Sequence, residues 1–147
     1  MRAVVTAGAG FLLAVLWFDL MFDVQARRHR GDVPEPVLAS IAGYYRRVTT
    51  DARPMNLVVA FGMLITLGVV IAQVVRDAEP AWATWSSVLF VGAPVVLARI
   101  RTVPNAVRLG ARVDPLARQS ELARSILRDH LFCLGSIGCL LAVQLAA

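Results

Sequence analysis

Residues 55–75 read MNLVVAFGMLITLGVVIAQVV and contain no charged side chain. About 20 consecutive apolar residues are enough for a helix to cross the hydrocarbon core of a bilayer. Further apolar runs occupy residues 3–24, 82–98 and 131–147. The sequence therefore predicts an all-α fold, an integral membrane four-helix up-down bundle that forms one domain over residues 1–147.

The composition agrees with a membrane protein. Of the 147 residues, 58% are hydrophobic and only 17% are charged, whereas soluble domains carry about a quarter charged residues. The chain contains no P-loop, no GxGxxG, no GxSxG and no HExxH motif. Nothing in the sequence therefore favours nucleotide-driven chemistry or the hydrolases that these motifs mark.

The arginines predict how the chain is oriented in the membrane. Every basic residue is an arginine, and most of them lie in the connections at residues 25–54 and 99–129. Only Arg2 and Arg76 lie on the other side of the predicted bundle. By the positive-inside rule, both termini are outside and both long loops are cytoplasmic. We expect a multi-pass protein of a cell membrane, such as the bacterial inner membrane, whose arginines contact anionic lipid headgroups rather than nucleic acid.

The two long connections contain helical signals of their own. Asp114 followed by Pro115 is typical of a helix start, which predicts one helix that continues into the last span. The first connection carries apolar residues at helical spacing, which predict a short amphipathic helix lying in the membrane interface, with its tyrosines as anchors. The apolar residues are Val37, Leu38, Ile41, Tyr44, Tyr45 and Val48.

Small and polar residues within the spans predict how the helices pack. Gly62 and Gly68 allow a neighbouring backbone to approach closely, and Thr66, Gln73 and Gln144 are expected to form interhelical hydrogen bonds. The only two cysteines are six positions apart in the last span. They should point in different directions and cannot form a disulfide within one helix.

Asp19 and Asp23 are the most informative polar residues. They are four positions apart, so they share one face of the first helix. An aspartate at the centre of a bilayer costs about 2.5–3.5 kcal/mol on insertion scales, so such residues rarely face lipid. Two interpretations stay open: a site for a proton, a metal or a polar substrate, and a structural ion pair with Arg27 or an arginine of another helix.

Three residues of the later chain join them as candidates. Arg101 and Asn105 follow the third span and are able to bind a substrate oxygen, although Arg101 is equally able to reach the lipid headgroups. His130 opens the last span and is suited to acid-base catalysis or to a hydrogen bond at the interface. In an up-down bundle the first and fourth helices are neighbours. We therefore expect His130 to approach Asp19 and Asp23.

Cofactor chemistry has weaker support in the sequence. Asp19, Asp23 and His130 are suitable metal ligands if their helices meet. A haem with two histidine ligands would need His29, which lies in a charged loop. We therefore expect neither a resident metal nor another cofactor.

Three short segments resemble the anthrone-oxygenase-like family of small four-helix integral membrane proteins. The first is FDLMFDV at residues 18–24, at the end of the first span. The second is RTVPN at residues 101–105, which is similar to an Asn-Val-Pro-Leu-Asn segment of the family. The third is RDH at residues 128–130, which is similar to its Asn-His pair before the last helix.

The resemblance implies a cofactor-independent oxygenation of a hydrophobic polycyclic aromatic substrate. In that case Asp19 or His130 would act as the catalytic base, and Asp23, Arg101 and Asn105 would bind the substrate. The alternative is a protein without catalysis, either a small transporter or an accessory subunit of a larger membrane complex. A homo-oligomer is a further alternative for such a bundle.

Overall fold

The computed structural model describes residues 1–76 and 80–147, and the described chain is helical without a β-strand. Two short π-helical turns, η1 and η2, interrupt or extend the α-helices. In chain order the elements are α1 (Arg2–Arg27), α2 (Glu35–Arg46), η1 (Arg47–Asp51), α3 (Arg53–Val75), α4 (Ala81–Leu97), η2 (Ala98–Thr102), α5 (Val103–Ala111) and α6 (Leu116–Ala146).

Within the part of the chain that the structure describes, four helical stretches are long and apolar enough to cross a membrane. They are α1, the part of α3 over Asn56–Val75, the continuous stretch Ala81–Ala111 and α6. These stretches contain the four apolar runs of the sequence, so the prediction of four long apolar helices is confirmed. The described chain is therefore an all-helical bundle, and its four long apolar helices indicate a multi-pass membrane protein.

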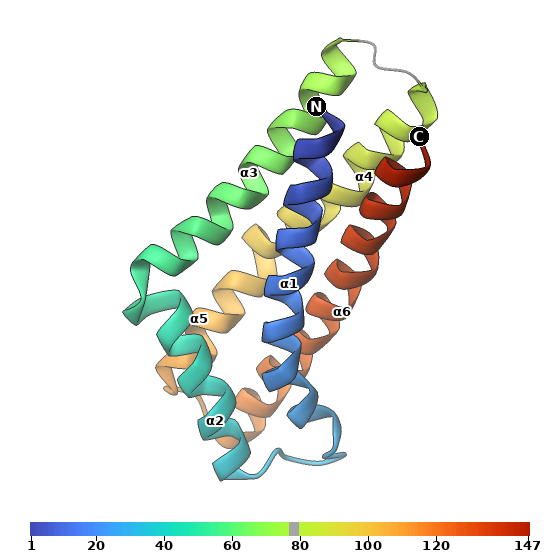
Figure 1. Cartoon of the computed structure of the whole chain (residues 1–147). Helices are drawn as coiled ribbons and strands as arrows, with labels where there is room; N and C mark the ends of the chain where they lie inside the picture. Colours follow the sequence, from blue (N-terminus) through green and yellow to red (C-terminus); the bar gives the residue numbers. More distant parts are fainter. Residues whose placement is uncertain (77–79) are drawn as a thin grey trace.

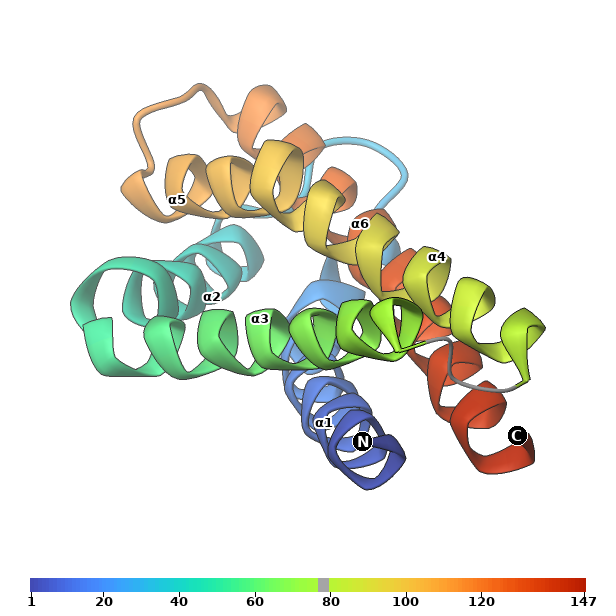
Figure 2. The same cartoon turned by 90° about the horizontal axis from the view of Figure 1, so that it is seen from above.

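The long helices form a ring in the order of the chain. Helix α1 packs against α3 and α6, and α4 packs against the same two helices (Figures 1 and 2). Both termini lie at one end of the bundle, and α2 and α5 lie at the other (Figure 1). The predicted contact between the first and the last long helix is confirmed, because α1 and α6 pack along each other.

The third connection differs from the prediction in its first half. Residues 99–111 are helical rather than a loop, because α4 continues through the π-turn η2 into α5. Pro104 does not break this stretch; it follows the π-turn η2, and such local π-helical adjustments accommodate a proline within a helix. The helix ends at Arg112, whose φ of 54° is left-handed. The predicted helix from Pro115 into the last span is confirmed as α6.

The amphipathic helix of the first connection exists, but its apolar face is not in the membrane interface. Leu38, Ile41 and Tyr45 of α2 are buried in a cluster with Leu109 of α5 and Ile126 of α6. The interface prediction was wrong because the third connection supplies a second amphipathic helix, α5, which covers the apolar face of α2. Together these helices close one end of the bundle.

Close packing between α2 and α5 depends on Gly110. A Cβ atom at this position would lie 2.8 Å from the backbone nitrogen of Arg46. Of the two glycines singled out in α3, Gly62 does lie against a neighbour, the ring of Phe11, but Gly68 has nothing within 4 Å. The predicted approach of a neighbouring backbone is therefore found at neither position, because the neighbour of Gly62 is a side chain.

We expect Gly110→Ala to lower the free energy of unfolding by about 1–3 kcal/mol, because the added methyl group forces α5 away from α2. Gly135→Ala on α6 is the matched control. A Cβ atom there meets nothing within 4 Å, and alanine favours a helix by about 1 kcal/mol over glycine. Thermal unfolding in detergent, followed by helical circular dichroism, measures both. Equal melting temperatures would contradict the close approach.

Polar residues connect the spans at the end that carries the termini. The side-chain amide of Gln73 on α3 donates to Gln144 on α6 over 3.4 Å, and Gln144 donates to Ser87 on α4 over 2.8 Å. Thr66 donates instead to the carbonyl of Gly62 in its own helix. The predicted interhelical bonds are thus confirmed for both glutamines and not for Thr66.

Candidate functional site

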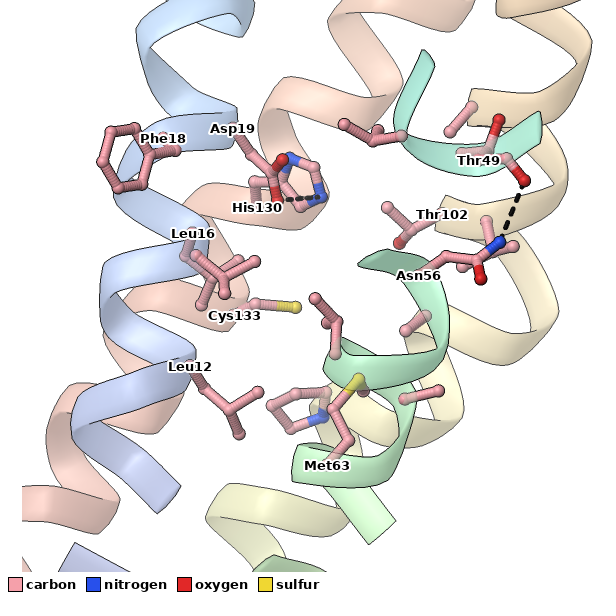
Figure 3. Close-up of a pocket in the computed structure, with 18 of the residues that line it drawn as sticks. Leu12, Leu16, Phe18, Asp19, Thr49, Asn56, Met63, Thr102, His130 and Cys133 are labelled. Atoms are coloured by element: carbon pink, nitrogen blue, oxygen red, sulfur yellow. Dashed lines mark hydrogen bonds and ion pairs between the residues drawn. The ribbon is translucent and has the colours of Figure 1, made fainter. Parts of the chain in front are cut away.

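A cavity of about 570 Å³ reaches from the middle of the bundle towards the end that carries α2 and α5 (Figure 3). Its wall is mainly apolar, and every helix of the chain contributes to it. Such a cavity, apolar with a few polar groups, is the usual form of a small-molecule site. The polar and sulfur-containing lining residues are Asp19, Tyr44, Tyr45, Thr49, Asn56, Met63, Thr102, His130 and Cys133.

His130 is held against the cavity by Asp23. Its Nδ1 lies 2.7 Å from Oδ2 of Asp23, whose side chain is fully buried on α1. Oδ1 of Asp23 accepts the hydroxyl of Tyr45 over 2.6 Å. A carboxylate only accepts hydrogen bonds, so Nδ1 is the donor, and in the neutral imidazole the other ring nitrogen, Nε2, keeps its lone pair. This arrangement fixes both the tautomer and the orientation of the imidazole.

Asp19 lies on the cavity wall beside the same ring. Its Oδ2 is 3.9 Å from Nε2 of His130, which is too long for a direct hydrogen bond. Its Oδ1 accepts the hydroxyl of Tyr44 over 2.6 Å. The Tyr44 ring is stacked on Phe22, with ring centroids 4.2 Å apart. A small polar group of a ligand can therefore lie between the carboxylate and the imidazole (Figure 3).

The two tyrosines remain neutral hydrogen-bond donors. Burial raises the pKa of both hydroxyls above the usual value near 10, and the neighbouring carboxylates raise these pKa values further. Asp19 acts most strongly on Tyr44, and Asp23 acts most strongly on Tyr45. Each aspartate within the first span is thus paired with an uncharged donor from α2.

Arg101 and Asn105 do not line the cavity. Arg101 binds both carboxylate oxygens of Asp129, and the Thr102 hydroxyl donates to the same carboxylate over 3.1 Å. Asn105 donates to Ser125 over 3.4 Å. Arg101 and Asn105, which were predicted to bind substrate together with Asp23, therefore tie the η2–α5 stretch to α6.

Three of the five predicted site residues lie together in the structure. Asp19, Asp23 and His130 meet as expected, although Asp23 is fully buried behind the imidazole and is not part of the cavity wall. Asp19 is bonded by a tyrosine, so the alternative of an arginine ion pair is not what holds it. Tyr44 and Tyr45 were predicted to be interface anchors and not residues of the site. The sequence did contain a signal for them. The first apolar run, residues 3–24, has two carboxylates and no arginine, so neutral hydrogen-bond donors were needed to bind these carboxylates.

The site does not have the geometry of a metal centre. Within residues 1–76 and 80–147, no group of three His, Cys, Asp or Glu side chains is arranged to hold a metal ion. Both cysteines are free; Cys133 is buried and Cys139 is exposed, so they point apart as predicted. Cys133 lines the cavity one turn beyond His130.

Comparisons of the chain with protein-family models, curated proteins and solved structures find no match. The function has to be argued from the site, because a helical bundle alone supports many activities. The observation that distinguishes this bundle is a buried Asp–His pair that presents one imidazole nitrogen to an apolar cavity.

Proposed function

We propose that the chain is a membrane enzyme that removes a proton from a hydrophobic, hydroxylated aromatic substrate and allows it to react with O₂. The observation that carries this proposal is the bond between Nδ1 of His130 and Asp23, which leaves Nε2 directed at the cavity. A base oriented by a buried carboxylate is a recurring arrangement in proton abstraction. The resemblance to anthrone-type oxygenases supplies the substrate class.

Each polar residue has a role in this reaction. The hydroxyl group of the substrate lies between Asp19 and His130, where Asp19 accepts its hydrogen bond. Nε2 of His130 removes a proton from the neighbouring CH₂ group of the central ring. Tyr44 and Tyr45 hold the two carboxylates in place through bonds of 2.6 Å. The apolar wall binds the rings and excludes water from the carbanion.

The reaction balances without a bound cofactor. The carbanion passes electrons to O₂ and forms a carbon–oxygen bond, which gives a peroxide at the ring carbon. The protonated imidazole returns its proton as the peroxide loses one molecule of water, and the CH₂ group becomes a carbonyl. One O₂ is consumed for each water and each quinone formed.

A transporter or an accessory subunit is the competing proposal. A transporter needs a path to both faces of the membrane, whereas the end with the termini is filled by an apolar cluster. This cluster consists of Val5, Ala9, Leu12, Val70, Val91, Ile137 and Leu140. The closed end favours a binding or catalytic cavity over a transport path.

The direct test is oxygen consumption by the purified protein in detergent with a hydroxylated anthrone as substrate. We expect consumption of O₂ with formation of the quinone in equal amounts, and no dependence on added metal or chelator. Protein carrying His130→Gln should consume no O₂ above the uncatalysed rate. Equal rates for wild type and His130→Gln would contradict the proposal and favour a bundle without catalysis.

We also propose that both termini lie outside the cell and that the end with α2 and α5 is cytoplasmic. Most of the arginines belong to the connections at that end. Reporter fusions after Arg30 and after Arg112 are therefore expected to give cytoplasmic signals, and a fusion after Asp77 the opposite signal. A cytoplasmic signal from the last fusion would contradict this orientation.

A further inference from the structure

Some residues that line the cavity are also exposed on the outer surface of the bundle. Val103 and Val107 of α5 line the cavity and are 52% and 44% exposed. Ala60 of α3 lines it and is exposed as well. All three belong to stretches of membrane-spanning length. Exposed surface on such stretches faces the membrane, so the cavity reaches the membrane-facing side of the bundle between α3 and α5.

The packing of α3 explains this opening. In the described part of the chain α3 contacts α1, α4 and η1, but neither α5 nor α6. Seen along the bundle, α3 and α5 lie on opposite sides of α2 (Figure 2). The gap is bounded by the contact of α3 with α4 at one end and by η1 at the other. On the side of α3 that faces α1 the two helices are closely packed, since the Phe11 ring packs on Gly62.

We propose that this gap is a lateral portal through which a ligand dissolved in the bilayer reaches His130. The lateral portal is formed by Ala60, Val103 and Val107. The inference rests on the proposed function for the role of the ligand, but the route itself does not require turnover. An apolar molecule is already concentrated in the membrane, so a path from the side avoids its transfer through water.

The distribution of polar groups defines the class of the ligand. The side chains of Thr49 and Asn56 are engaged with backbone carbonyls: Thr49 donates to Tyr45 over 2.7 Å and Asn56 donates to Thr49 over 3.0 Å (Figure 3). The polar groups of Asp19, Tyr44 and His130 are clustered on another part of the wall. The ligand is therefore apolar over most of its length, with one hydrogen-bonding end.

Cys133 provides a reporter for the route. It lines the cavity, is only 5% exposed, and is the single thiol of the chain once Cys139 is replaced by serine. In liposomes that hold the Cys139→Ser protein, an uncharged N-phenylmaleimide is expected to label Cys133. A sulfonated maleimide, present on both sides of the membrane, is expected not to label it. The Cys133→Ser protein, which keeps the exposed Cys139, is the positive control. Labelling of Cys139 shows that the apolar reagent reaches the bilayer.

Blocking variants identify the portal. In the Cys139→Ser background, Val103→Trp and Val107→Trp are expected to slow labelling by the apolar reagent about tenfold or more, because a packed indole has to move aside before the reagent passes. Val96→Trp is the matched control, since Val96 is 58% exposed on α4 and does not line the cavity. Val103→Phe serves as the second variant if a tryptophan protein does not elute as folded protein in size-exclusion chromatography.

The outcomes separate the route from the reaction. Labelling by the charged reagent, labelling by neither reagent, or equal rates in the blocking and control variants would each overturn the lateral portal. His130→Gln should keep the labelling rate of its parent while it loses turnover. Labelling as expected without any oxygen consumption would therefore refute the proposed reaction and leave the portal standing.

Discussion

We expect Asp23→Asn to lower the rate of the proposed oxygen consumption about 10³–10⁴-fold, while the helical bundle stays folded. Asparagine has nearly the same size as aspartate, and its amide oxygen still accepts the Tyr45 hydroxyl. Its NH₂ group, however, donates to Nδ1 of His130, where the carboxylate accepted. The proton of the imidazole then moves to Nε2, and the nitrogen that faces the cavity loses its lone pair.

This loss is distinguishable from simple unfolding. Because both hydrogen bonds of residue 23 are kept, and only the bond to His130 changes direction, the melting temperature of Asp23→Asn should stay close to that of the wild type. Asp32→Asn is the control, since Asp32 is exposed in the loop between α1 and α2. Oxygen uptake and helical circular dichroism of the same preparations give both readouts. If Asp23→Asn keeps its turnover, Asp23 does not orient the catalytic base.

The sequence carried enough information for the long helices and for their neighbours. Four apolar runs of spanning length admit few arrangements, and an up-down ring places the first helix beside the last. From this, the meeting of Asp19, Asp23 and His130 followed without knowledge of any side-chain contact. The observed 2.7 Å between Asp23 and His130 confirms that step.

The end of the bundle with α2 and α5 was not predictable in the same way. The sequence shows α2 to be amphipathic, but not whether its apolar face meets lipid or protein. That choice depends on α5, whose RTVPN segment reads as a turn because it contains a proline. The π-turn η2 directly before Pro104 accommodates the proline, so the helix continues. The tyrosines of α2 were misplaced for this reason.

Arg101 and Asp129 show a second limit of sequence reasoning. Both are charged residues near the ends of apolar runs, where solvent or lipid headgroups are the default partners. Their pairing depends on a contact between η2 and α6 that spans 28 positions of the chain. Only the folded arrangement shows that Asp129 is fully buried and that Arg101 is its cation.

We expect Arg101→Met to lower the free energy of unfolding by about 2–3 kcal/mol, the largest effect on stability that we predict for a single charged residue. Removing one partner of a buried ion pair costs about 3–5 kcal/mol, because it leaves an uncompensated charge inside the protein. The lower value applies here because the Arg101 side chain is 53% exposed and partly screened by solvent. The Thr102 hydroxyl, which also binds Asp129, remains in place.

Two further variants test this explanation. Arg118→Met breaks an ion pair with Glu121 in which both side chains are about half exposed or more, so it should change the stability by less than about 1 kcal/mol. The double variant Arg101→Met with Asp129→Leu removes the buried charge together with its partner, and it should regain much of the stability that Arg101→Met loses.

Chemical or thermal unfolding of the four proteins in one detergent gives the comparison, because detergent and protein concentration affect apparent stability. The position of Asp129 directly before His130 links this stability to the site, since a shift of α6 moves the imidazole away from Asp23. Arg101→Met should therefore also reduce oxygen consumption, and the double variant should restore part of it. If the double variant is no more stable than Arg101→Met, the buried charge of Asp129 is not the cause of the loss.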